Sequence, residues 1–180
     1  MHGLGEPSDW VRRWASLIPP GGRVLDLACG GGRHLRWLAA QGFATTGVDR
    51  DAQALATLQG VGELITADLE NGPWPLAGRQ FDAVIITNYL WRPTVPQVIA
   101  LLAEGGVLIH ETFADGHQAL GKPSRPEFLL RTGELLSLYA GLRVVAFEDG
   151  YRDDPPRFVQ RIAAVKAPPG PGRYALRAAG

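Results

Sequence analysis

The most restrictive feature of this sequence is the stretch 24–38, VLDLACGGGRHLRWL. A short apolar strand over 24–28 carries Asp26 and runs into three consecutive glycines, Gly30 to Gly32. Because glycine has no Cβ, a turn built from it can bend sharply and approach a ligand closely. A helix beginning near Gly32 would direct its free N–H groups at that ligand. The stretch therefore predicts a nucleotide-binding unit of strand, turn and helix.

Composition sets limits on the rest of the chain. The 180 residues are 46% hydrophobic and 20% charged, which suits one soluble domain with a substantial core. The 18 basic residues cancel the 18 acidic ones, so overall charge gives no reason to expect nucleic acid as a partner. Cys29 is the single cysteine, and the four histidines lack metal-ligand spacing. We therefore expect no disulfide within the chain and no metal site.

The sequence also indicates the cellular compartment of the protein. No apolar run approaches the roughly 18 residues needed to span a bilayer. The first ten residues, MHGLGEPSDW, contain two acids and lack the apolar segment of a signal peptide. We expect a cytoplasmic protein without membrane attachment, and the sequence leaves the oligomeric state open.

Apolar segments alternate with helical patterns along the chain. The expected helices include one over about 8–17, one between Gly32 and Gly42, one over 51–58, one that ends before Gly105, and one near 132–140. The expected strands are 24–28, 44–49, 63–67, 83–87, 107–112, 142–147 and 158–165. This alternation predicts an α/β fold with a doubly wound, mostly parallel seven-stranded sheet.

The last third of the chain interrupts that alternation. The link DGYRDDPPR between the last two strands is too short and too rich in proline for a crossover helix, so these strands should form an antiparallel hairpin. After it the chain reads APPGPGRYALRAAG. We expect a single domain over 1–166 and a flexible tail over 167–180.

Two kinds of nucleotide could fit the glycine turn. A dinucleotide fold requires G-x-G-x-x-G, and Leu35 stands where its third glycine should be. The pattern D-x-x-x-G-x-G, formed by Asp26, Gly30 and Gly32, is more informative. A carboxylate is unfavourable beside a pyrophosphate and favourable beside a ligand that carries an ammonium group. The turn thus favours a cationic ligand over NAD.

Four segments in order resemble the class I S-adenosylmethionine-dependent methyltransferases. LDLACGGGRH resembles their first motif, TTGVDRD their second strand, TADLENGPW their third-strand segment and FDAVIITNYLW their fourth. The resemblance covers roughly 8–166 and implies a Rossmann-like sheet that ends in the antiparallel hairpin. CGGGRH, HETFADGHQALGKP and FLLRTGELL together are similar to small bacterial tellurite-resistance (TehB-like) methyltransferases.

The resemblance implies S-adenosylmethionine as cofactor and assigns residues to it. Asp26 and the backbone of Ala28, Gly30 and Gly32 would hold the methionine end, unless Asp26 only caps the turn. Asp49, which stands 19 residues after Gly30, would accept both ribose hydroxyls. The alternative is that Asp49 only caps the next helix, but we expect the neighbouring Asp51 to be that cap.

The resemblance also assigns roles to Arg50, Asp68, Leu69 and Asn88. For Arg50, Asp68 and Asn88 the sequence leaves a second interpretation open. Arg50 either stacks on the adenine or is solvated. Asp68 would accept from the adenine amino group, with the Leu69 N–H at a ring nitrogen, unless Asp68 only begins a turn. Asn88 ends the fourth strand and is either a ligand contact or a turn residue.

The catalytic candidates follow the fourth and fifth strands. Tyr89 should lie beside the reactive methyl group, while His110 and Glu111 are candidate bases if the acceptor must lose a proton. Because side chains alternate along a strand, only one of these two can face the site directly. Trp10 and Trp14 either cover the cleft or pack beneath it.

The resemblance implies direct methyl transfer to a nucleophile, with catalysis mainly by positioning and exclusion of water. We expect a small-molecule acceptor. The alternatives are an RNA or protein methyltransferase and a non-catalytic S-adenosylmethionine-binding module. An NAD-dependent oxidoreductase is disfavoured by Leu35 and by the terminal hairpin.

Overall fold

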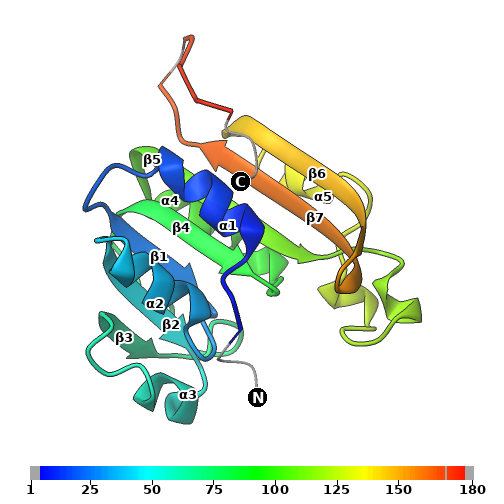
Figure 1. Ribbon diagram of the computed structural model, residues 1–180, viewed down its shortest axis with the longest axis horizontal. Coiled ribbons are helices and arrows are strands. Elements are labelled where there is room, and N and C mark those ends of the chain that lie inside the picture. The colour runs from blue at the N-terminus through cyan, green and yellow to red at the C-terminus, as the bar shows by residue number, and fades with distance from the viewer. Residues whose placement is uncertain (1–4, 169, 177–180) are drawn as a thin grey trace.

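The structure is a computed structural model that describes residues 5–168 and 170–176. Its described part contains one seven-stranded sheet in the order β3-β2-β1-β4-β5-β7-β6 (Figure 1). β1 to β5 are parallel, and β7 runs antiparallel between β5 and β6. The strands are β1 Arg23–Leu27, β2 Ala44–Asp49, β3 Glu63–Thr66, β4 Phe81–Thr87, β5 Leu102–Phe113, β6 Arg143–Asp153 and β7 Pro156–Val165. The predicted fold class is confirmed.

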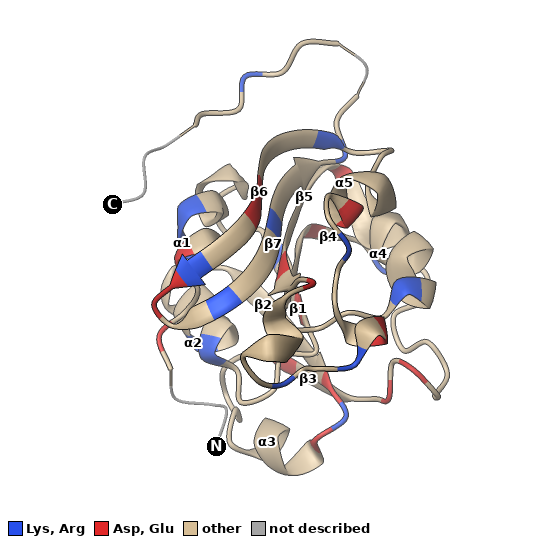
Figure 2. Cartoon of the chain, turned by 90° about the vertical axis from the view of Figure 1, so that its right-hand side faces the viewer, with Lys and Arg blue, Asp and Glu red and all other residues tan. Residues whose placement is uncertain are grey.

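Helices cover both faces of the sheet. They are α1 Asp9–Trp14, α2 Arg33–Ala40, α3 Ala52–Ala56, α4 Val95–Leu101 and α5 Glu134–Leu138. Figure 2 places α1 and α2 on one side of the sheet and α4 and α5 on the other. Each side has its own apolar core, so the sheet is doubly wound. Within the described residues, no helix has the length and apolar character needed to cross a membrane.

The C-terminal hairpin is longer than its sequence predicts. Most of the segment predicted as a link, DGYRDDPPR, is part of the two strands. β6 continues to Asp153, β7 begins at Pro156, and these two residues pair directly. Backbone hydrogen bonds between antiparallel strands need no apolar side chains, so the polar, exposed tip of the hairpin can remain paired. β5 is also longer than predicted, since it begins at Leu102 and passes through two glycines.

Helical segments are shorter than predicted. α1 ends at Trp14 and continues as a 3₁₀ turn over Ala15–Leu17, and α5 begins only after Gly133, whose φ is +69°. In the predicted tail, residues 167, 168 and 170–176 carry no helix or strand. Residues 1–4 of the predicted domain, and 169 and 177–180 of the predicted tail, lie outside the described residues.

The N-terminal helix is anchored on the sheet by its two tryptophans. The Ser8 hydroxyl caps α1 by accepting from the Trp10 N–H at 3.1 Å. The Trp10 and Trp14 rings meet edge to face at 5.6 Å, and the Trp10 indole N–H donates to the carbonyl of Ile162 at 3.2 Å. Both side chains are buried, so the interpretation that they pack against the sheet is confirmed.

A buried ion cluster joins α1 to β5 and β7. Glu111 is fully buried and accepts from the Ser8 hydroxyl at 3.0 Å. Its carboxylate lies 3.3 Å from the Arg161 guanidinium and 3.6 Å from that of Arg157. Arg161 also contacts Asp9 at 3.2 Å. This cluster holds the N-terminal segment on the same face of the sheet as α2.

Replacing Glu111 should therefore destabilise the protein. In Glu111→Ala the buried guanidinium of Arg161 loses a partner, so we expect the free energy of unfolding in urea to fall by about 3 kcal/mol. The matched control is Glu127→Ala, which breaks the exposed pair with Arg125 and should leave the urea midpoint nearly unchanged. Equal losses in the two variants would contradict the structural role of the cluster.

Candidate functional site

The turn after β1 is shaped by left-handed backbone. Gly30 and Gly32 have φ of +52° and +73°, and Gly32 is the N-cap residue of α2. A Cβ on Gly32 would lie 2.5 Å from the Leu58 side chain, so close packing as well as φ requires glycine there. Ala28 and Asn88 are the non-glycine residues with positive φ in the described part of the chain, and each directly follows a strand. Such backbone strain is typical of functional sites.

Asp49 fixes this turn to the end of β2. One carboxylate oxygen accepts from the Gly30 N–H at 2.7 Å, and the other accepts from the Asp51 N–H at 2.9 Å. Asp51, in turn, caps α3 through the N–H groups of Gln53 and Ala54. The expectation that Asp51 and not Asp49 caps the helix is therefore confirmed.

A first hollow opens at the carboxyl ends of β1 to β4. Its volume is about 160 Å³. It is lined by Ala28, Asp49, Arg50, Ala67, Asp68, Leu69, Glu70 and Tyr89. Five of the predicted cofactor residues thus meet in one place, which is where ligands of open α/β sheets bind.

Asp68 performs the turn role that its sequence left open. Its carboxylate accepts from the backbone N–H groups of Glu70 at 2.9 Å and Asn71 at 3.1 Å, and these bonds lower the pKa of the carboxyl. The segment that carries Leu69 is thereby held against the first hollow. Contact of Asp68 and Leu69 with an adenine stays a prediction.

Asp26 lies beneath the glycine turn without a partner. It is 1% exposed, and neither carboxylate oxygen has a hydrogen-bond partner among the described residues. Burial raises the pKa of Asp26 to about 8, opposed by the positive charge of Arg33. Buried polar groups are nearly always satisfied, so an unsatisfied carboxylate indicates a group that a ligand completes.

His34 separates Asp26 from the N-terminal segment, which passes beside α2 (Figure 1). The Ser8 N–H donates to His34 Nε2 at 3.1 Å, so the proton of the neutral ring is on Nδ1. Nδ1 lies 3.4 Å from the Thr87 hydroxyl and 4.0 Å from the Asp26 carboxylate. Burial lowers the pKa of His34 to about 3, so the ring is neutral at physiological pH. His34 lies in the first turn of α2.

A second hollow adjoins the first. It also has a volume of about 160 Å³ and shares Glu70 and Tyr89 with the first hollow. It is lined by Glu70, Asn88, Tyr89, Leu90, Thr112, Phe113, Pro123 and Phe128. The Tyr89 hydroxyl has no hydrogen-bond partner among the described residues, and burial raises its pKa, so it is a neutral phenol. Asn88 belongs to this second hollow and not to the first.

The two candidate bases on β5 lie outside both hollows. His110 Nδ1 is 2.9 Å from the Tyr139 hydroxyl, and Nε2 is 3.0 Å from the Tyr89 carbonyl. Burial lowers the pKa of His110 to about 4. Glu111 points to the opposite face, into the ion cluster. The prediction that His110 or Glu111 faces the site is therefore wrong. The polar atoms of both side chains contact other groups of the protein.

Other predictions concern cysteine and metal. Cys29 is buried, and burial raises the pKa of its thiol, so it is a small buried thiol and not a nucleophile. In residues 5–168 and 170–176, no group of three or more acidic, histidine or cysteine side chains could hold a metal ion. Glu70 was not among the predicted site residues. The available signal was its place two residues after Asp68, at the carboxyl edge of the sheet.

Comparison with known proteins finds similarity to methyltransferases over part of the chain. Residues 24–106 match the model of a family described as "Methyltransferase domain". YqeM of Bacillus subtilis (strain 168), a protein provisionally named as a methyltransferase, is 31% identical over 58% of this chain and 49% of its own length. This chain spans about half the length of the curated relatives it matches.

Solved structures give the fold. An S-adenosylmethionine-dependent methyltransferase from Mesorhizobium loti has a TM-score of 0.69 at 17% identity, over 88% of this chain and 98% of that one. TehB from Haemophilus influenzae has a TM-score of 0.67 at 21% identity, over 91% and 63% of the two chains. The resemblance inferred from the motifs is confirmed, and it implies S-adenosylmethionine as the cofactor. Residues 24–106 therefore match a methyltransferase domain model, and the chain has the fold of solved S-adenosylmethionine-dependent methyltransferases.

Proposed function

We propose that the protein transfers a methyl group from S-adenosylmethionine directly to a small-molecule acceptor. The observation that carries this proposal is the contact between the two hollows. The first is lined by five of the predicted cofactor residues, and the second shares Glu70 and Tyr89 with it. The volume of the second hollow, about 160 Å³, suits a small molecule better than a nucleotide chain or a folded protein.

The residues of the site fit the chemical groups of this cofactor. The unsatisfied carboxylate of Asp26 is complementary to the ammonium of the methionine end, beside the backbone of Ala28, Gly30 and Gly32. Asp49 still has free lone pairs for the ribose hydroxyls after it accepts from two N–H groups.

The remaining cofactor contacts are assigned to the rim of the first hollow. Arg50 is exposed there and can cover the adenine, while Asp68 and Leu69 can face its edge. These assignments follow from the resemblance and from the common hollow.

The mechanism then depends mainly on position. When bound, the cofactor supplies an activated methyl group. Tyr89 borders both hollows as a neutral hydroxyl, so it can orient the acceptor without an ionic charge of its own. Phe113 and Phe128 exclude water from the second hollow. With His110 and Glu111 bonded elsewhere, the acceptor nucleophile loses its proton to water or to Glu70 if it must lose one.

The activity is tested by methyl transfer from cofactor labelled in the methyl group. Purified protein is incubated with fractionated bacterial metabolites, RNA and protein. We expect label in the metabolite fraction alone. Label mainly in RNA or protein would refute a small-molecule acceptor, and cofactor binding without transfer to any fraction would favour a non-catalytic binding module.

Asp49→Asn should weaken binding of S-adenosylhomocysteine about 30-fold, as measured by calorimetry. The amide keeps one acceptor oxygen but loses the charge, and a hydrogen bond to a charged group contributes about 2 kcal/mol. Asp51→Asn is the matched control, since asparagine also caps helices well, and its affinity should stay within about threefold of the wild type. Equal affinities in wild type and Asp49→Asn would limit Asp49 to a structural role.

Binding of S-adenosylhomocysteine should also tighten as pH rises. The Asp26 carboxyl is protonated in the free protein below about pH 8, and it must lose that proton to pair with an ammonium. The affinity should therefore increase by up to about tenfold per unit between pH 6 and 8, and then level off.

The groups that act on Asp26 are Arg33, Asp49 and the neutral ring of His34. Asp26→Asn removes the titrating carboxyl and should give weaker binding with no slope over this pH range. If the wild type binds S-adenosylhomocysteine with constant affinity between pH 6 and 8, Asp26 does not pair with the cofactor.

A further inference from the structure

We propose that the second hollow recognises an acceptor with a small flat apolar body and a positively charged amine, which the carboxylate of Glu70 binds. This inference rests on the proposed function, because it concerns the acceptor side of the same site. It makes Glu70 the residue that determines specificity.

Four of the eight residues that line the second hollow are apolar, and two of these four are aromatic. Leu90, Phe113, Pro123 and Phe128 line it, and the Phe113 ring is stacked on His117 with centroids 4.3 Å apart. Its volume of about 160 Å³ is close to that of an apolar cavity of about 150 Å³ that binds benzene. The walls therefore fit a single ring or an aliphatic group of similar size.

Glu70 supplies the only charged side chain among the residues that line this hollow. The other polar lining groups, Asn88, Tyr89 and Thr112, are neutral. In the described part of the chain, the Glu70 carboxylate forms no hydrogen bond or ion pair. Glu70 lines both hollows together with Tyr89, so it lies at their boundary.

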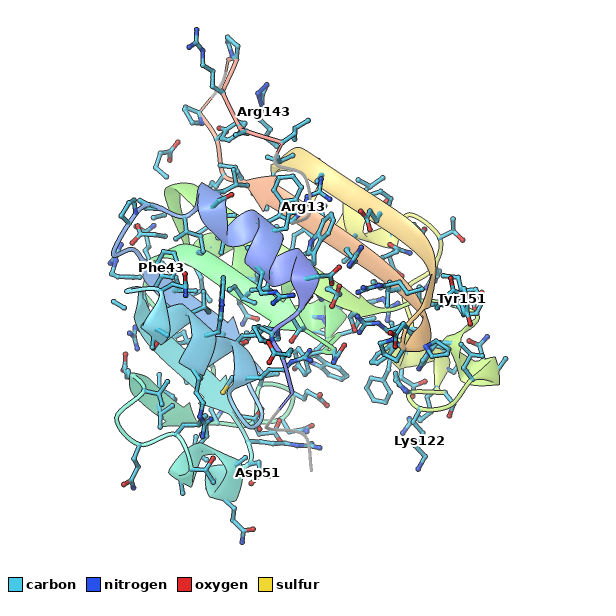
Figure 3. The ribbon with its side chains drawn as sticks, viewed as in Figure 1. Arg13, Phe43, Asp51, Lys122, Arg143 and Tyr151 are labelled. Carbon is cyan, nitrogen blue, oxygen red and sulfur yellow. The ribbon has the colours of Figure 1, made fainter. Side chains whose placement is uncertain are left out.

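Cations around the second hollow are already neutralised or point elsewhere. Arg92 pairs with Glu134 at 2.6 Å, and Arg125 pairs with Glu127. Lys122 precedes the lining residue Pro123, but its side chain is exposed and extends away from the molecule (Figure 3).

Arg50 lines the first hollow and not the second. An anionic acceptor would thus meet an uncompensated carboxylate with no cation in the walls, whereas an ammonium would neutralise it.

Three probes of similar shape and different charge test this inference. Benzylamine, benzyl alcohol and phenylacetate are titrated by NMR into protein saturated with S-adenosylhomocysteine, which lacks the sulfonium charge. We expect benzylamine to bind at least tenfold more tightly than phenylacetate, with benzyl alcohol between them. Glu70→Gln should bring the three affinities within about threefold, and Glu70→Lys should reverse their order.

Glu104→Gln is the matched control, because Glu104 is exposed near the start of β5, far from the carboxyl edge. It should keep the order of the wild type. Equal or tighter binding of phenylacetate by the wild type, no binding of any probe, or an order that survives Glu70→Gln would overturn the inference. Binding of S-adenosylhomocysteine is measured first, so failure of the proposed cofactor site is seen separately from failure at Glu70.

Discussion

The site depends on one carboxylate, that of Asp49, which closes the glycine turn against the end of β2. Its bonds to the N–H groups of Gly30 and Asp51 join the start of α2 to the start of α3. Charge-assisted bonds of this kind are short and directional, so they fix the backbone of the turn more firmly than neutral contacts would. The space between the turn, β3 and β4 then has a defined shape, and the first hollow follows from it.

Asp26, on β1 beneath the same turn, is by contrast a carboxylate with no hydrogen-bond partner in the described part of the chain. Its carboxylate is buried without a partner and lies 4.0 Å from a neutral histidine ring, an arrangement that is unfavourable for the isolated protein. The ion cluster around Glu111 and the two tryptophans of α1 supply stability on the same face of the sheet. Such a division, with strain at the ligand site and stability beside it, is typical of functional sites.

The sequence predicted those features that depend on local pattern. The period of apolar residues located each strand, and the glycine turn with Asp26 and Asp49 located the first hollow, because backbone sterics alone restrict such a turn. The partners of His110 and Glu111 were not predictable, since they come from Tyr139 and Arg161, which are distant in sequence. The second hollow was missed in part for the same reason: Pro123 and Phe128 lie in an irregular loop without periodicity.

The most direct test of the central claim is a crystal structure with S-adenosylhomocysteine bound. The account predicts the ribose hydroxyls on the Asp49 carboxylate, with its bonds to Gly30 and Asp51 retained, and the ammonium on Asp26, directly or through one ordered water. A ligand seated elsewhere, or one that leaves the Asp26 carboxylate without a partner, would contradict it.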